Sequence, residues 1–559
     1  MRPAFVRAGC NLAQMAKYSL GVDYGTNSAR ALLVDVANGR EVASAVYNYA
    51  SGEAGVILDA NDPNLARQNP QDYVDGFFST VQTVLEGIDP EDVIGLGIDT
   101  TGSTPMPVDT EGIPLSFHPK FADEPAAMAW LWKDHTSYAE AAEITAKARE
   151  RGEPYLAKCG GTYSSEWFWS KILHCARTKP EVFAAAYAWV ELADFVPAYL
   201  TGTLRPDLTV RSVCAAGHKA MFSDDWNGLP SREFLSSLDP RLADLRDRLY
   251  SNAYPSDKLA GRLTAEAAAK SGLKEGTPVA VGAFDAHMGA VGSGAKAGTL
   301  VKIMGTSTCD CMVHPLDQPL ADVPGLCGIV KGSVLPGYFG LEAGQSAVGD
   351  IFNWFSSFCG RSHEDLTAEG AKLATGASGL LALDWNNGNR TILVDPLLTG
   401  LLVGQTLHTT PGEVYRALVE ATAFGALKII QRMEEYGVEV REVINCGGIA
   451  EKSPFVMQIY ADVCNRPMKV SRSGQTCALG AAIFGAVVGE AYPDVESAQD
   501  RMTGVKERIY TPEPGSAAVY ARLYELYSQL HDAFGTQEWS GKMGNVMKEL
   551  LKIRAEARA

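Results

Sequence analysis

The stretch YSLGVDYGTNSARALLV, residues 18–34, decides the fold of this chain. Two apolar runs flank a tight turn of small residues, which predicts a β-hairpin. About 280 residues later, LVKIMGTSTCDCMV at residues 300–313 repeats the pattern of apolar run, Gly-Thr turn and second apolar run. A repeat over this distance predicts two similar halves, each a mixed α/β unit that opens with such a hairpin.

Each half also contains a second strand that ends in small residues, at 93–103 and at 443–449. Ligands of open α/β sheets bind at the carboxyl ends of such strands. The clearest helix runs from Thr410, an N-cap with Glu413 completing a capping box, to Gly437 as its C-cap. We expect the two halves to close about this helix.

A length of 559 residues predicts more than one domain. Residues 1–17 carry Arg2, Arg7 and Lys17, no acid and no apolar secretory segment, so they form a separate extension. They are either a transit peptide or a leader before a natural start at Met15. Glycines and a proline near 276–280 place the domain boundary there. The sequence therefore predicts an extension over 1–17, a first domain over 18–277, a second domain over 278–535, and a basic, frayed tail over 536–559.

Composition excludes several classes of function. Asp plus Glu number 66 and Lys plus Arg 49, which gives a net charge of 49 − 66 = −17. This charge disfavours nucleic acid and anionic membranes as partners. The eleven cysteines form neither a disulfide framework nor paired metal knuckles, so we expect reduced thiols in the cytoplasm. No apolar run approaches the roughly 20 residues that span a bilayer.

The two Gly-Thr turns are the candidate phosphate sites, because the motifs of P-loop and Rossmann nucleotide-binding proteins are absent. Gly25-Thr26-Asn27-Ser28 and Gly305-Thr306-Ser307 can each direct backbone N–H groups at phosphate oxygens. Facing each other, they would hold a triphosphate from both sides. Asp23, two residues before the first turn, either holds Mg²⁺ or caps its own turn.

Asp285 follows a fully apolar strand and opens a helix rich in Gly and Ala. A carboxylate in this position is either a general base for a hydroxyl proton or an N-cap without chemistry. We interpret His287 as a structural hydrogen-bonding residue. Lys219 and Glu342 both lie among small residues, which leaves room for a small polar ligand.

Together these residues resemble the sugar kinases of the FGGY family. The resemblance rests on five motifs: 160–169 (GGTYSSEWFW), 215–219 (AAGHK), 282–289 (GAFDAHMG), 305–310 (GTSTCD) and 340–346 (GLEAGQS). The similarity extends over about residues 18–534, and it is strongest to the members that phosphorylate L-ribulose. The resemblance implies an α/β fold of two duplicated ribonuclease H-like domains around a cleft, as in actin, hexokinase and Hsp70.

The resemblance also implies the roles of single residues. Asp285 is expected to be the catalytic base that deprotonates the sugar. The phosphates are expected to contact Gly25, Thr26, Asn27 and Ser28 together with Gly305, Thr306 and Ser307, and Mg²⁺ is expected to contact Asp23. Adenosine is expected to contact Gly447, Gly448 and Ser453, and the ketose to contact Ser103, Lys219 and Glu342.

The implied reaction is the phosphorylation of L-ribulose at O5 by ATP and Mg²⁺ in L-arabinose catabolism, in a cytoplasmic homodimer. Two alternatives stay open at this point. The first is another pentulokinase, for D-ribulose or D-xylulose. The second is an actin-like or Hsp70-like nucleotide switch with a protein partner, against which the small-residue surroundings of Asp285, Lys219 and Glu342 argue.

Overall fold

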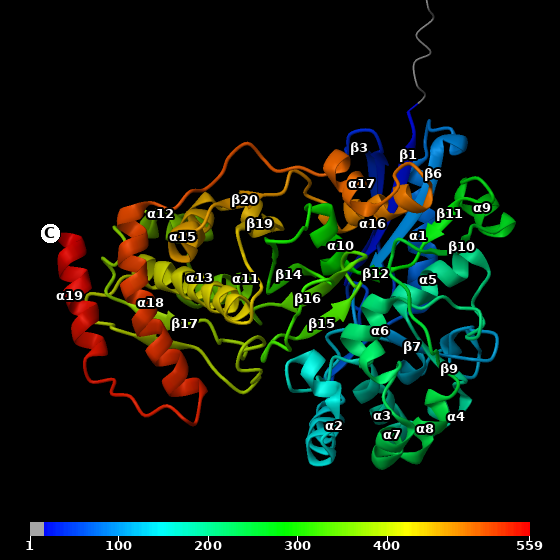
Figure 1. The fold of residues 1–559 in the computed structure, drawn as a ribbon, viewed down its shortest axis with the longest axis horizontal. Helices are drawn as coiled ribbons and strands as arrows, with labels where there is room; N and C mark the ends of the chain where they lie inside the picture. Colours follow the sequence, from blue (N-terminus) through cyan, green and yellow to red (C-terminus); the bar gives the residue numbers. More distant parts are fainter. Residues whose placement is uncertain (1–15) are drawn as a thin grey trace, which may run out of the picture.

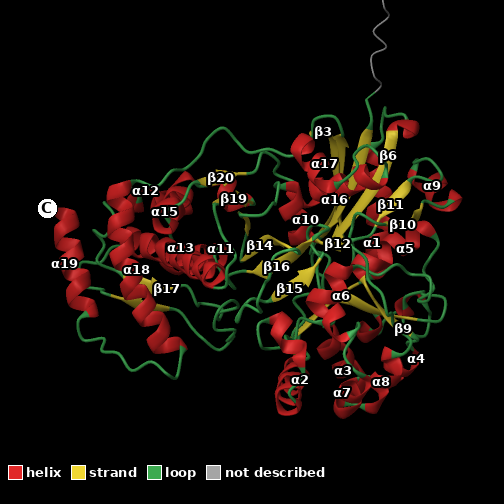
Figure 2. Cartoon of the chain, in the orientation of Figure 1, coloured by secondary structure: helices red, strands yellow, loops and turns green. Residues whose placement is uncertain are grey.

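The computed structural model describes residues 16–559 and contains two large mixed sheets (Figures 1 and 2). The first sheet consists of the following strands, in spatial order: β10 (Leu259–Arg262), β11 (Pro278–Ala280), β6 (Val93–Thr100), β1 (Tyr18–Tyr24), β2 (Ser28–Asp35) and β3 (Arg40–Asn48), with β12 (Ala283–Phe284) also on β6. The second consists of β15 (Gly328–Lys331), β16 (Tyr338–Ala343), β14 (Thr308–Pro315), β13 (Thr299–Met304), β19 (Glu442–Cys446) and β20 (Met468–Val470).

The two sheets confirm the predicted repeat. In the first, β1 pairs with β2 antiparallel and with β6 parallel. In the second, β13 pairs with β14 antiparallel and with β19 parallel. Each hairpin turn therefore lies where the first strand of a half ends, beside the carboxyl end of the parallel strand. This is the two-domain fold shared by actin-like and hexokinase-like ATPases.

Smaller sheets and helices complete each half. The small sheets are β4 (Ile57–Asp59), β5 (Asp62–Gln68) and β8 (Ala129–Trp130); β7 (Pro105–Val108) and β9 (Ala188–Glu191); β17 (Leu381–Leu383) and β18 (Leu401–Val403). The helices of the first half are α1 (Pro70–Val84), α2 (Tyr138–Arg151), α3 (Phe168–Thr178), α4 (Pro180–Ala185), α5 (Leu192–Thr201), α6 (Val213–Lys219), α7 (Arg232–Leu238), α8 (Pro240–Arg246) and α9 (Ala265–Ser271). Those that follow are α10 (Asp285–Gly292), α11 (Gly349–Cys359), α12 (His363–Gly370), α13 (Pro411–Glu435), α14 (Gly448–Lys452), α15 (Pro454–Cys464), α16 (Thr476–Val488), α17 (Val495–Met502), α18 (Pro514–Gly535) and α19 (Val546–Arg558).

Helices α10 and α16 join the two halves. They pack on each other, α16 lies on β1 and β6 of the first sheet, and α10 touches β13 and β14 of the second (Figure 1). Glycines allow the close approach of α16, because a Cβ at Gly97 would lie 1.9 Å from the carbonyl oxygen of Ala481. A Cβ at Gly21 would lie 1.8 Å from the carbonyl oxygen of Ala478. Any larger residue at either position would force the helix off the sheet.

The predicted role of the helix after Thr410 is wrong, although the helix itself is confirmed. Thr410 caps α13, and Glu413 completes the capping box. The helix packs on α11, α12, α15 and β17, inside the core of the second half. The elements between the two sheets are instead α10 and α16, and α6 of the first half also packs on β15 of the second sheet.

Two boundaries also differ from the predictions. β11 and β12 pair with β6, so the first sheet continues past the boundary expected between residues 277 and 278. We propose that the halves divide between the end of α10 and the start of β13. The tail predicted to fray forms α19, which buries Val546, Leu550 and Ile553 against the second core. The extension predicted over residues 1–17 lies outside the described residues, except for Ala16 and Lys17.

Candidate active site

A cavity of about 250 Å³ is lined by residues of both halves, the second Gly-Thr turn among them. Its walls come from the segment just after β6, from α6, β12 and α10, from the β13–β14 turn and from β16. Figure 1 shows α6, α10, β12 and β16 near the centre of the molecule. The lining residues are Thr101, Gly102, Trp132, Glu166, Lys219, Phe284, Asp285, Ala286, His287, Ile303, Gly305, Thr306, Ser307, Cys309, Glu342, Arg390 and Cys477. Four groups of predicted site residues therefore meet in one place: Lys219, Asp285, Glu342 and the second turn.

Asp285 lies at the first residue of α10, where its carboxylate enters the cavity. Its Oδ1 accepts a hydrogen bond of 2.6 Å from the backbone N–H of Ala286. Burial raises the pKa of Asp285 to about 7, the charge of Asp23 adds to the increase, and the Ala286 N–H opposes it. A carboxylate with a pKa near neutrality can take a proton from an alcohol and release it again, which suits a general base.

Lys219 and Glu342, which also line the cavity, form an ion pair. The Lys219 Nζ lies 3.2 Å from Oε1 and 3.4 Å from Oε2 of Glu342. Burial alone would raise the pKa of Glu342, but the charge of Lys219 is the main cause that holds it well below its usual range. Burial likewise disfavours the charged lysine, and Glu342 raises the pKa of Lys219 above its ordinary value. The pair is therefore fully charged and offers donors and acceptors to sugar hydroxyls.

His287 differs from its predicted role as a structural hydrogen-bonding residue. Within residues 16–559, neither of its ring nitrogens has a hydrogen-bond partner, although the side chain is 2% exposed. Its ring lies 4.5 Å from that of His218, centroid to centroid. Unlike His287, His218 is anchored through Nε2 to the Ser333 hydroxyl at 3.0 Å.

Each of the two predicted phosphate turns is closed by a backbone hydrogen bond from its glycine, to the third residue on in the first turn and to the second residue on in the second turn. The Gly25 N–H donates to the Ser28 carbonyl at 3.0 Å, and the Gly305 N–H donates to the Ser307 carbonyl at 2.9 Å. The second turn is also held on α11, because the N–H groups of Val348 and Asp350 donate to the Thr306 carbonyl. The first turn adjoins the cavity through a tryptophan from another loop.

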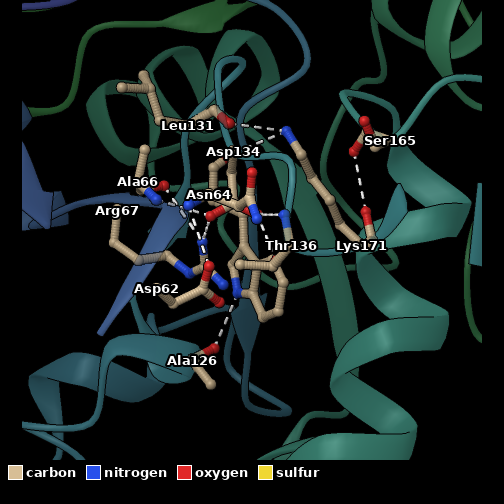
Figure 3. A network of polar contacts seen from close by, with 12 residues as sticks. Asp62, Asn64, Ala66, Arg67, Ala126, Leu131, Asp134, Thr136, Ser165 and Lys171 are labelled. Atoms are coloured by element: carbon tan, nitrogen blue, oxygen red, sulfur yellow. Dashed lines mark hydrogen bonds and ion pairs between the residues drawn. The ribbon is translucent and has the colours of Figure 1, made fainter. Parts of the chain in front are cut away.

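That tryptophan is Trp132, which lines the cavity and donates its indole N–H to the Thr26 hydroxyl at 3.0 Å. A buried network holds the loop that carries it (Figure 3). Arg67 pairs with Asp134 and stacks 3.4 Å from the centroid of the Trp130 ring. Lys171 donates to the Leu131 carbonyl at 2.9 Å. The network fixes Trp132 between the first turn and the cavity.

Asp23 lies beside a second carboxylate, Asp99, that the sequence analysis missed. The two are register partners at the ends of the parallel strands β1 and β6. Their oxygens and the Cys477 thiol lie within 4.8 Å of one another. Asp99 is fully buried, and in the described part of the chain no N–H or hydroxyl group donates to its carboxylate. Its side-chain hydrogen bond is with the carboxyl group of Asp23, which requires one of the two acids to hold a proton. Burial raises the pKa of Asp23 and, more strongly, that of Asp99.

A buried carboxylate pair of this kind fits a divalent cation. Carboxylate oxygens are the ligands that Mg²⁺ prefers, and two adjacent acids without a cation oppose each other's ionisation. A cation there would lie next to the first phosphate turn. The signal that could have identified Asp99 is that it is the single charged residue of β6 and lies near the end of that otherwise apolar strand.

Ser103, predicted to contact the ketose, is not among the residues that line the cavity. It is fully buried, and its hydroxyl donates to the carboxylate of Glu191 on β9. Thr101 and Gly102, just before it, line the cavity in its place. Arg390 is a further lining residue that the sequence analysis missed, since it lies in a loop whose position only the tertiary structure sets.

The predicted adenosine residues gather at the start of α14 and α15. Gly447 has a φ of +90°, and a Cβ there would lie 2.5 Å from the Met304 carbonyl oxygen. Gly448 has open space around its Cα, with nothing within 4 Å of an added Cβ among residues 16–559. Ser453 caps α15 by accepting from the Val456 N–H at 3.3 Å. The glycines thus leave one face of this corner open beside the second turn.

Comparison with known proteins gives concordant matches over almost the whole chain. Residues 18–292 match the N-terminal domain, and residues 300–488 the C-terminal domain, of the FGGY family of carbohydrate kinases. A protein named ribulokinase from Shouchella clausii is 43% identical, with 97% of this chain and 99% of that protein covered. A ribulokinase from Mycolicibacterium smegmatis is 42% identical, with 97% of each chain covered. The crystal structure of xylulose kinase from Rhodospirillum rubrum has the same fold, with a TM-score of 0.77 at 24% identity over 92% of this chain and 99% of that one.

Proposed function

Because the chain belongs to the FGGY family of carbohydrate kinases, we propose that it transfers the γ-phosphoryl group of ATP to O5 of L-ribulose. The chain is an ATP-dependent carbohydrate kinase that phosphorylates a pentulose. The choice of L-ribulose, and a place in L-arabinose breakdown, rest on its similarity to the ribulokinases. The observation that carries the chemistry is the meeting of Asp285, the Lys219–Glu342 pair and the second turn in one cavity.

In the proposed reaction, Asp285 accepts the proton of the O5 hydroxyl as the oxygen attacks phosphorus. Phosphoryl transfer asks little covalent chemistry of a protein, so positioning and charge stabilisation dominate. Lys219 and Glu342 bind other hydroxyls of the ketose and fix the O5 hydroxyl against Asp285. The backbone N–H groups of the turns at 25–28 and 305–307 hold the phosphates, and Gly447, Gly448 and Ser453 form the adenosine corner.

Asp23 and Asp99 would hold Mg²⁺, because their oxygen donors and their charge fit such an ion. The bound ion would supply positive charge to the triphosphate.

The proposed cytoplasmic location agrees with the described cysteines, which are all free thiols. A homodimer stays a prediction. None of the helices over residues 16–559 is long and apolar enough to cross a membrane.

A coupled assay of ATP consumption tests the substrate. The purified protein is supplied with L-ribulose, D-ribulose, D-xylulose, L-xylulose and pentitols in turn, and the product is examined by phosphorus–proton NMR. We expect the highest kcat/KM for L-ribulose and a phosphorus coupling to the C5 protons. A higher kcat/KM for another ketopentose would assign the chain to that sugar, and coupling to the C1 protons would refute transfer to O5.

The Asp285→Ala variant tests the base. We expect sugar phosphorylation to be lost while calorimetric titration still detects binding of a non-hydrolysable ATP analogue. Turnover near that of the unmodified enzyme would remove the assignment. ATP hydrolysis that is independent of any sugar and is stimulated by a protein would instead favour a nucleotide switch.

A further inference from the structure

The side chain of His287 reaches the cavity with its hydrogen-bonding capacity unused. It lines the cavity two residues after Asp285, is 2% exposed, and within the described chain neither Nδ1 nor Nε2 has a partner. Buried polar groups in folded proteins are almost always hydrogen-bonded, so each exception needs a reason. The surroundings of His287 supply that reason.

Packing alone does not account for a histidine at this position. The ring lies against His218, with centroids 4.5 Å apart, and 6.2 Å from the centroid of the Phe284 ring. A phenyl ring would fill the same flat space without burying two unpaired nitrogens, whose desolvation lowers stability. A ligand in the cavity would give the two ring nitrogens of His287 the hydrogen-bond partners that the protein itself does not supply.

The charge state of the His287 ring favours a role in hydrogen bonding over a role in proton transfer. Burial lowers the pKa of His287 to about 4, so the ring is neutral near pH 7. A neutral imidazole has one donor and one acceptor nitrogen. It can therefore both give and receive a hydrogen bond with a hydroxyl group, and it does not compete with Asp285 for the transferred proton.

The position of the ring identifies which kind of group it would meet. The Nε2 atom lies 3.6 Å from Oε2 of Glu342, which is too long for a direct hydrogen bond. One hydroxyl oxygen can lie within hydrogen-bonding distance of both atoms, accepting from the imidazole and donating to the carboxylate. Sugar hydroxyls have this dual capacity.

We propose that His287 binds a non-reacting hydroxyl of the ketose together with Glu342, and so reads the configuration at that carbon. This inference rests on the proposed function, since it needs a ketose in the cavity. A site built to hydrogen-bond a hydroxyl discriminates strongly against a substrate that cannot supply it in the right place, because the buried partners then stay unpaired. His287 is thus a specificity-determining residue beside the catalytic carboxylate.

The test compares His287→Phe with His287→Gln on a panel of L-ribulose, D-ribulose, D-xylulose and L-xylulose. Phenylalanine keeps the flat shape and removes both nitrogens, whereas glutamine keeps one donor and one acceptor. For His287→Phe we expect kcat/KM for L-ribulose to fall about 10- to 100-fold, mostly through KM, and the preference over its epimers to shrink by a similar factor. His287→Gln should recover part of both.

Two measurements separate recognition from a loss of structure. The affinity for a non-hydrolysable ATP analogue and the melting temperature are recorded for each variant. His314→Phe is the matched control, because His314 is also buried, on β14, and its Nε2 lacks a partner in residues 16–559. It should leave sugar preference unchanged.

A folded His287→Phe enzyme with unchanged KM and unchanged epimer preference would overturn the proposal. So would a His287→Gln enzyme that behaves like His287→Phe, since the hydrogen-bonding atoms would then not matter. If the unmodified enzyme phosphorylates no ketopentose at all, the proposed function fails first, and that outcome is distinct from the other two.

Discussion

Replacing Asp285 by asparagine should abolish activity and stabilise the folded protein above pH 7. The pKa of Asp285 is raised by burial from 3.8 to about 7. A difference of about three pKa units corresponds to about 4 kcal/mol, since each unit is about 1.4 kcal/mol. That free energy is the cost of keeping the carboxylate ionised in the cavity, and asparagine removes it while its carbonyl oxygen can still accept from the Ala286 N–H.

The sign follows from proton binding. Between pH 4 and pH 7 the folded protein holds this proton and the unfolded chain does not, so rising pH removes stability across that window. Above pH 7 the full difference applies, whereas at pH 5 it falls to about 1.5 kcal/mol by the same relation. Asp285→Asn should therefore exceed the original protein in stability by about 4 kcal/mol at pH 8 and by much less at pH 5.

The assay is urea unfolding of both proteins at pH 5 and pH 8, followed by fluorescence. A pH–rate profile of the unmodified enzyme provides a second measure, because its kcat/KM should fall about tenfold from pH 8 to pH 6 as the base is protonated. Equal stability of the two proteins at both pH values, with a flat rate profile, would refute a raised pKa and with it the argument for Asp285 as a base.

The remaining predictions concern the ion pair, the cation site and the joint between the halves. Glu342→Gln leaves the Lys219 charge buried without its partner, so KM for the ketose should rise about tenfold or more while ATP affinity, measured by calorimetry, stays the same. Asp99→Asn should weaken Mn²⁺ binding, followed by electron paramagnetic resonance, by about tenfold; unchanged affinity would remove Asp99 from the cation site. Gly97→Ala should lower the free energy of unfolding by about 1–3 kcal/mol, because its methyl group meets α16, whereas Gly515→Ala has open space among the described residues and should not destabilise.

The sequence by itself determined the features that depend on neighbours along the chain. The Gly-Thr hairpin at 25–28, its repeat at 305–307 and the capped helix after Thr410 all follow from local turn chemistry and periodicity, and the structure contains each of them. Asp285 was identifiable because an isolated carboxylate after an apolar strand is a local signal.

Only the tertiary structure decided which side chains face the cavity and which form their hydrogen bonds with other parts of the chain. Ser103 turns to Glu191, 88 residues away along the chain. Asp99 meets Asp23 only because β1 and β6 pair in parallel. His287 was expected to form a structural hydrogen bond, but neither of its ring nitrogens has a hydrogen-bond partner within residues 16–559. The helix α19, too polar to predict, folds because three of its apolar residues find the second core. Such contacts join distant segments, and local sequence patterns carry no record of them.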